Sequence, residues 1–165
     1  LLAYKNHLDI LKEIKERDLK VDFNQGLDIR LINNENAKLL SEIKYYGLSS
    51  DFKKKTLRFS FDNTNDKPYI KRGVRMLLDA GIRPKNIFFY VLAYTDNILD
   101  AVHRVNVLKE LGCRPFIMPY NQIFTKEMRK LQHWVDYMPY YSFIEWEDFN
   151  PRTKNNKDTQ NKTLF

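Results

Sequence analysis

A four-residue pattern occurs twice in this chain, as Gly-Ile-Arg-Pro at 81–84 and as Gly-Cys-Arg-Pro at 112–115. Each copy follows an amphipathic segment with helical periodicity and precedes a run of apolar residues with strand character. A further glycine, Gly47, ends a similar amphipathic segment 34 residues before Gly81. This spacing is typical of a repeated βα unit, which predicts an α/β fold with right-handed crossovers and a parallel sheet.

The periodicity predicts helices at 4–17, from Asn33 or Asn34 to Gly47, from Asp66 to Gly81, at 98–111, and after a cap at Thr125. Strands are expected at 21–23, 57–61, 87–92 and 116–118. The continuous apolar run at 87–92 indicates a strand that is covered on both faces. Four parallel strands fit either part of a barrel or part of an open doubly wound sheet.

Several features indicate a piece of a longer protein. The chain begins at Leu1 rather than Met, and four parallel strands leave two open edges. With 165 residues and 43% hydrophobic content, it can still form one core. We expect an α/β partial-barrel fragment at 1–138, followed at 139–165 by an aromatic segment and a basic polar tail.

Cysteine content and hydropathy restrict the classes of site and location. The only cysteine, Cys113, excludes an intrachain disulfide and a multi-cysteine metal site in this sequence. The three histidines lack metal-ligand spacing, so no metal site is predicted. No apolar run approaches the ~20 residues needed to span a bilayer. We expect a cytoplasmic protein with no membrane partner.

Polar residues follow every predicted strand, where ligands bind in parallel α/β folds. Asp62 is the strongest single candidate. Asn63 and Asp96 also fit a role as turn or cap residues, and Asp28 and Arg30 could simply pair with each other. The opposite strand ends carry Arg83, Lys85 and Arg114, which we interpret as solvated turns. The candidate set at the carboxyl ends is Asn24, Gln25, Asp28, Arg30, Ser60, Asp62, Asn63 and Asn121.

In this order, the segments VDFNQGLDIR (21–30), LRFSFD (57–62), FYVLAY (89–94) and PFIMPY (115–120) resemble the second half of the core of radical S-adenosylmethionine (radical SAM) enzymes. The resemblance covers about residues 20–120. It implies a partial TIM-like (β/α)6 barrel, of which these strands are about the third to the sixth. It also implies two cofactors in the parent protein, S-adenosylmethionine (SAM) and a [4Fe–4S] cluster. The family's C-x3-C-x2-C motif is absent here, so the cluster ligands would belong to a missing N-terminal half, the expected partner.

The resemblance also assigns roles to residues. Ser60 and Asp62 stand where the family contacts the ribose or methionine of SAM, and Asn24, Gln25, Asp28 and Arg30 share the same rim. The strand that backs the adenine contributes Val91, Leu92 and Ala93, the last where the family often has glycine. Completing the adenine pocket are Met118, Pro119 and Tyr120. The substrate is not readable, and the fragment alone is expected to be inactive.

The distribution of charge supports a different functional interpretation. The formal net charge is +7, and basic residues cluster at Lys53, Lys54 and Lys55 and again in the tail after residue 151. Together with the many Tyr and Trp residues, this pattern fits a basic α/β nucleic-acid-binding module without redox chemistry. A barrel fragment of other chemistry is a third possibility, and the charge also fits an ordinary solvated surface.

Overall fold

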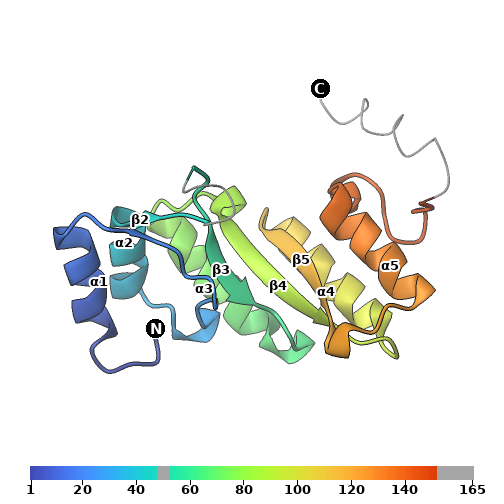
Figure 1. Ribbon diagram of the computed structural model, residues 1–165, viewed down its shortest axis with the longest axis horizontal. Coiled ribbons are helices and arrows are strands. Elements are labelled where there is room, and N and C mark those ends of the chain that lie inside the picture. The colour runs from blue at the N-terminus through green and yellow to red at the C-terminus, as the bar shows by residue number, and fades with distance from the viewer. Residues whose placement is uncertain (48–52, 152–165) are drawn as a thin grey trace.

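The computed structural model describes residues 1–47 and 53–151, and the predicted basic tail lies outside them (Figure 1). Helices and strands alternate along this part of the chain. The helices are α1 (His7–Glu16), α2 (Asn34–Glu42), α3 (Lys67–Asp79), α4 (Ile98–Glu110) and α5 (Lys126–Gln132). The strands are β1 (Lys20–Val21), β2 (Lys44–Tyr45), β3 (Leu57–Ser60), β4 (Ile87–Ala93) and β5 (Arg114–Pro119).

The strands form two parallel sheets. β3, β4 and β5 lie side by side in that order, with Phe59 opposite Phe89 and Tyr90 opposite Phe116. β1 and β2 form a separate pair. The α/β class and parallel pairing are therefore confirmed, whereas the expectation of one four-stranded sheet is wrong. The described residues form no closed barrel.

The chain around Gly47 differs from the prediction. α2 ends at Glu42, Ile43 is already extended, and the chain continues directly into β2. Gly47 therefore does not end a helix, and Tyr46 does not lie on a helical face. The spacing of Leu40, Ile43 and Tyr46 fits a helix, whereas Ile43 and Tyr45 alternate with polar neighbours as in a strand. In the structure Ile43 and Tyr45 are both buried, and the chain is extended there.

Other local signals are confirmed. The Asn33 side chain accepts a hydrogen bond from the backbone N–H of Asn36 at 2.9 Å and caps α2, and the Thr125 hydroxyl accepts one from Met128 at 3.1 Å and caps α5. After α3 and α4 the chain turns at Gly81 and Gly112, whose φ values are +90° and +68°. These left-handed conformations favour glycine, which explains why both copies of the pattern begin with glycine.

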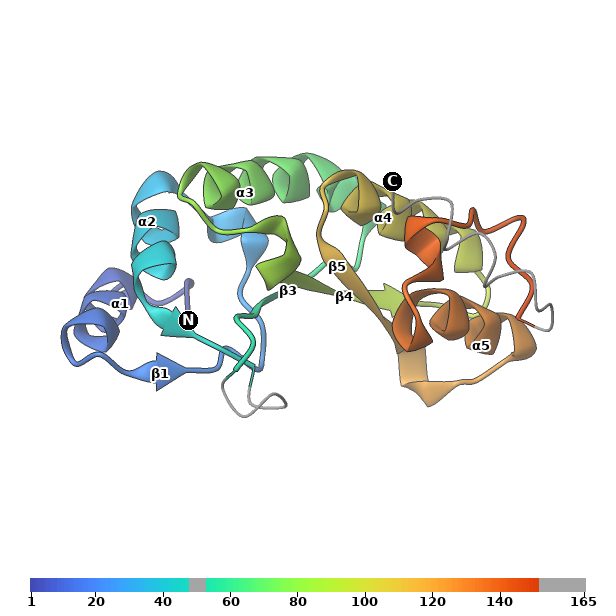
Figure 2. The same ribbon diagram turned by 90° about the horizontal axis from the view of Figure 1, so that it is seen from above.

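The three-stranded sheet is covered by helices on one side only. Figure 2 shows α3 and α4 along one side of the sheet, at the top of the view, while α1 and α5 flank the two ends of the other, concave side. Burial alternates along β4 accordingly: Phe89 and Val91 are fully buried, whereas Phe88 and Tyr90 are half-buried. The prediction that 87–92 is covered on both faces is thus wrong for this structure, because the residues on the second face are only half-buried and no helix of the described residues covers them.

The aromatic segment after α5 packs beside β5. A π-helical turn, His133–Tyr137, extends α5, and the Trp134 indole N–H donates to the carbonyl of Ile144 at 2.8 Å. Trp134, Tyr141 and Trp146 are buried in the same core as the strands. None of the helices in the described residues is long and apolar enough to cross a membrane.

Candidate functional site

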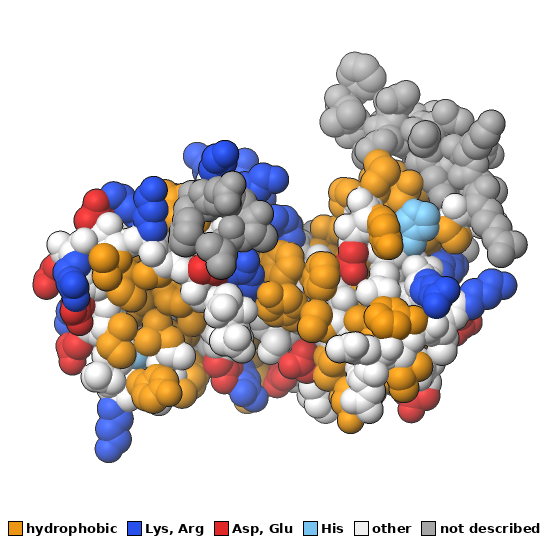
Figure 3. Space-filling view, in the orientation of Figure 1, with side chains coloured by type: hydrophobic (Ala, Val, Ile, Leu, Met, Phe, Trp, Pro, Cys, Tyr) orange, Lys and Arg blue, Asp and Glu red, His pale blue; other side chains and the backbone are white. Residues whose placement is uncertain are grey.

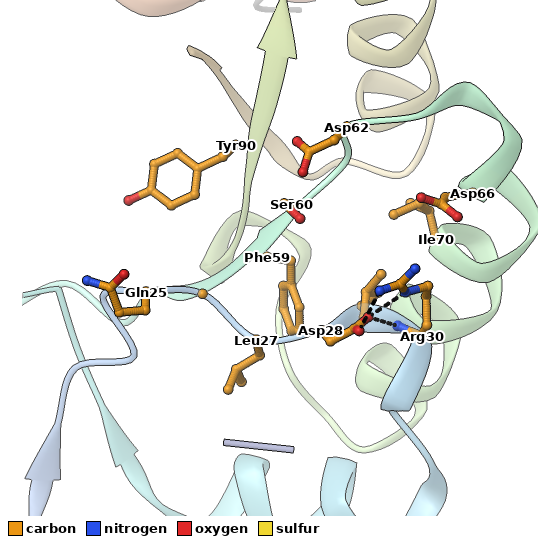
Figure 4. Close-up of a pocket in the computed structure, with 12 residues that line it drawn as sticks. Gln25, Leu27, Asp28, Arg30, Phe59, Ser60, Asp62, Asp66, Ile70 and Tyr90 are labelled. Carbon is orange, nitrogen blue, oxygen red and sulfur yellow. Dashed lines mark hydrogen bonds and ion pairs between the residues drawn. The ribbon is translucent and has the colours of Figure 1, made fainter. Parts of the chain in front are cut away.

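A pocket of about 410 Å³ lies at the carboxyl end of β3, beside the segment that follows β1 (Figure 4). Its floor is apolar and its rim is polar. Five residues that the sequence had assigned to the site line it, and Asp66 and Tyr90 are polar additions that the assignment had missed. The lining residues are Gln25, Gly26, Leu27, Asp28, Ile29, Arg30, Phe59, Ser60, Asp62, Asp66, Ile70 and Tyr90.

One wall of the pocket, called the near wall, consists of residues 25–30 and depends on a turn at Gly26. Its φ of +78° redirects the chain after β1, so that the Leu27 N–H donates to the Arg58 carbonyl at 2.7 Å and Leu27 pairs with Phe59. A short 3-10 helix, η1 (Ile29–Leu31), follows and packs against α3 at Gly73. The segment after β1 thereby reaches the edge of β3, although β1 itself pairs elsewhere.

Asp28 and Arg30 form an ion pair with each other. The Arg30 guanidinium donates to both carboxylate oxygens of Asp28, at 2.9 and 2.8 Å, and the Arg30 backbone N–H donates at 3.0 Å. These hydrogen bonds, chiefly those from the guanidinium, hold the pKa of Asp28 below its ordinary value. Asp28 thus stays ionised at the rim, with part of its acceptor capacity already used.

The carboxylate of Asp62 differs from that of Asp28 in its exposure and its partners. Asp62 follows β3, is exposed, and its carboxylate forms no hydrogen bond or ion pair with the described residues. Figure 4 shows it on the same side of the pocket as Tyr90, with Ser60 between Asp62 and Gln25. A free carboxylate near a hydroxyl and an amide can accept hydrogen bonds from a diol or pair with a cationic group.

A buried arginine fixes the strand ends behind this rim. Arg104 of α4 is fully buried and donates to the carbonyls of Phe61 and Leu92, at 2.5 and 2.8 Å. Its guanidinium also binds the carboxylate of Asp100, which accepts a hydrogen bond from Thr64. One cation thus ties together the ends of β3 and β4. The sequence pattern alone does not distinguish Arg104 from an ordinary polar residue on a helix.

The residues assigned to adenine lie on the same end of the sheet but outside this pocket. β4 and β5 are parallel and in register, with Leu92 opposite Met118 and Ala93 opposite Pro119. The side chains of Val91 and Ala93 are fully buried on the helix-covered side, so only their backbone could meet a ligand. Asn24 is exposed and does not line the pocket either.

Two of the residues that the sequence assigned to an adenine pocket are open to solvent. Met118 is 43% exposed and Tyr120 is 45% exposed. The Tyr120 ring lies against Tyr94, with 4.7 Å between the ring centroids. These side chains form a small aromatic and thioether surface at the carboxyl ends of β4 and β5, the kind of surface on which a planar base can stack.

The described residues do not suit a metal cluster. They contain no group of three or more His, Cys, Asp or Glu side chains arranged to hold a metal ion. Cys113 is buried at the amino end of β5, and burial raises the pKa of its thiol to about 12. A neutral, buried thiol at the opposite end of the sheet is a poor ligand for a rim-bound cluster.

Comparison with known proteins gave no match to this chain among family descriptions, curated proteins or solved structures.

Proposed function

We propose that the chain is the SAM-binding half of a radical SAM iron–sulfur enzyme, organised as part of a TIM-like (β/α)6 barrel and inactive without an upstream half. The observation that carries this proposal is the pocket at the carboxyl end of β3. It gathers Gln25, Ser60 and Asp62 with the Asp28–Arg30 pair, in the place where a parallel α/β fold binds its ligand.

The open face of the sheet gives independent support. Phe88, Tyr90 and Phe116 lie half-buried on it, and their rings contact one another at centroid distances of 5.2 to 6.1 Å. In a barrel this concave side would face inward and be covered by further strands and loops. An upstream half that completes the barrel would explain why apolar residues occupy both faces of β4.

The chemical features of the rim fit SAM. Asp62 and Asp66 could pair with its ammonium or ribose hydroxyl groups, Arg30 offers a cation near its carboxylate, and the surface at Met118 and Tyr120 suits its adenine. When SAM is bound, the chemistry supplied is cleavage at its sulfonium group. The residues of this chain would bind and orient the cofactor and keep water from the reacting atoms. No group of described residues fits the cluster, so we derive no step through it.

The test uses the protein with its upstream sequence, which on this proposal contains C-x3-C-x2-C. Asp62→Ala should weaken equilibrium binding of SAM by about 1–3 kcal/mol, since a buried polar partner loses its charged acceptor. Glu110→Gln, an exposed carboxylate of α4 far from the rim, serves as the control and should bind normally. Unchanged SAM affinity in Asp62→Ala would remove Asp62 from the site, and an upstream sequence without the cysteine motif would contradict the family assignment.

A further inference from the structure

A second pocket, of about 750 Å³, lies at the opposite, amino end of the sheet and is strongly basic. Figure 3 shows Lys and Arg side chains gathering at the top of the molecule, over the start of the three-stranded sheet. Among the described residues that line this pocket there is no Asp or Glu. Its cationic residues are Lys53, Lys54, Lys55, Arg83, Lys85 and Arg114.

Topology explains why these residues meet. Residues 53–55 lead into β3, Arg83 and Lys85 lie in the turn before β4, and Arg114 begins β5. Because the strands are parallel, their amino ends lie at one edge of the sheet, and three loops that are distant in sequence converge there. The sequence-based interpretation of Arg83, Lys85 and Arg114 as separate solvated turns did not include this convergence.

Arg114 is the most buried of the six cationic residues, since the other five are exposed. Its guanidinium lies over the Phe88 ring at 5.5 Å and donates to the Thr56 hydroxyl at 3.2 Å, while its Nε is buried without an acceptor in the described part of the chain. By contrast, the neighbouring Arg58 forms an ion pair with Asp22. A partly buried guanidinium that has no carboxylate partner is stabilised when an anion binds beside it.

We propose that this basic pocket binds the sugar–phosphate backbone of a single-stranded nucleic acid. Six cations around one recess exceed what a single phosphate can engage, whereas a flexible strand presents a phosphate at every nucleotide. A single strand can enter a recess between loops that would exclude a rigid duplex. The charge distribution favours this end, since Asp28, Asp62 and Asp66 line the pocket at the other end of the strands.

This inference goes beyond the proposed function and does not depend on it, because the two pockets lie at opposite ends of the sheet. The experiment measures binding of a fluorescent single-stranded oligonucleotide to the chain by anisotropy, at several salt concentrations. The pocket variant carries Lys53→Gln, Arg83→Gln and Lys85→Gln, all at exposed positions. A control variant loses the same charge elsewhere, through Lys5→Gln, Lys12→Gln and Lys38→Gln, also at exposed positions.

We expect the affinity of the unmodified chain to fall steeply with salt, and the pocket variant to bind at least ~10-fold more weakly at low salt. Its log–log slope should be shallower by about 2, since each phosphate that is no longer neutralised reduces the slope by about 0.7. The control variant should keep the original slope. Three results would overturn the proposal: no binding at the lowest salt, equal losses in both variants, or displacement by inorganic tripolyphosphate as effective, per phosphate, as by unlabelled oligonucleotide.

Discussion

Asp136 shows how a single residue links the aromatic segment to the sheet. Its carboxylate accepts a hydrogen bond from the Ile117 N–H at 3.0 Å, on the side of β5 that has no neighbouring strand in the described residues. Burial raises the pKa of this carboxyl to about 7, against the opposing effect of that hydrogen bond. Asp136 therefore satisfies an edge-strand donor and is costly to ionise.

The sign of the resulting pH dependence follows from the raised pKa. Between its ordinary value and about 7, the unfolded chain releases this proton while the folded chain retains it, so stability falls as pH rises through that window. Asp136→Asn keeps an oxygen acceptor for Ile117 and removes the charge. We expect the variant to be more stable than the unmodified chain by about 1–3 kcal/mol at about pH 8, and nearly equal to it at about pH 4.

Urea unfolding at the two pH values measures the difference. A stability difference that is the same at both would show that ionisation of Asp136 does not contribute. Glu147→Gln, an exposed carboxylate in the same segment, provides a control whose effect should be small at either pH.

At the scale of elements, the contact between α3 and η1 positions the near wall of the first pocket. Gly73 lies in the middle of α3, where a Cβ would come within 2.7 Å of the Ile29 side chain and 2.8 Å of the Ile29 carbonyl oxygen. Helix propensity alone predicts that Gly73→Ala would stabilise α3 by about 1 kcal/mol. The contact predicts the opposite, because α3 and η1 would have to separate.

We therefore expect Gly73→Ala to lower the free energy of unfolding by about 1–3 kcal/mol, the usual cost of overpacking. Chemical denaturation measures this cost, with Lys71→Ala as a control on an exposed position of the same helix that should change stability by less than ~0.5 kcal/mol. A more stable Gly73→Ala variant would show that α3 and η1 can separate without cost.

The elements also show how far sequence reasoning reaches. Gly81 and Gly112 were predictable because each follows a long, well-formed helical pattern, whereas the nine-residue α2 is too short for periodicity to separate a helix end from a strand. Ser60 and Asp62 were predictable because they directly follow one strand. The Arg104 bonds to two strand ends, and the basic pocket built from three loops, depend on tertiary contacts that no local pattern encodes.

At the scale of the whole molecule, the open face of the sheet allows a test of the proposed barrel. Phe116 and Ile117 are neighbours on β5 that point to opposite sides: Ile117 is fully buried beneath the helices, whereas Phe116 is half-buried on the open face. If an upstream half covers that face, replacing Phe116 by alanine should cost more unfolding free energy when the half is present. The cost of replacing Ile117 should not change.

The expected outcome concerns two variants, each measured in this chain and in a chain that carries the proposed upstream half. Ile117→Ala should cost about 2–5 kcal/mol in both. Phe116→Ala should cost about 1–2 kcal/mol in this chain, where one side of the ring meets solvent, and about 3–5 kcal/mol with the proposed upstream half present, where the ring would be enclosed. Urea unfolding gives all four values. An equal cost of Phe116→Ala in both contexts would mean that the concave face stays open when the upstream half is present, and this would contradict the proposed half-barrel.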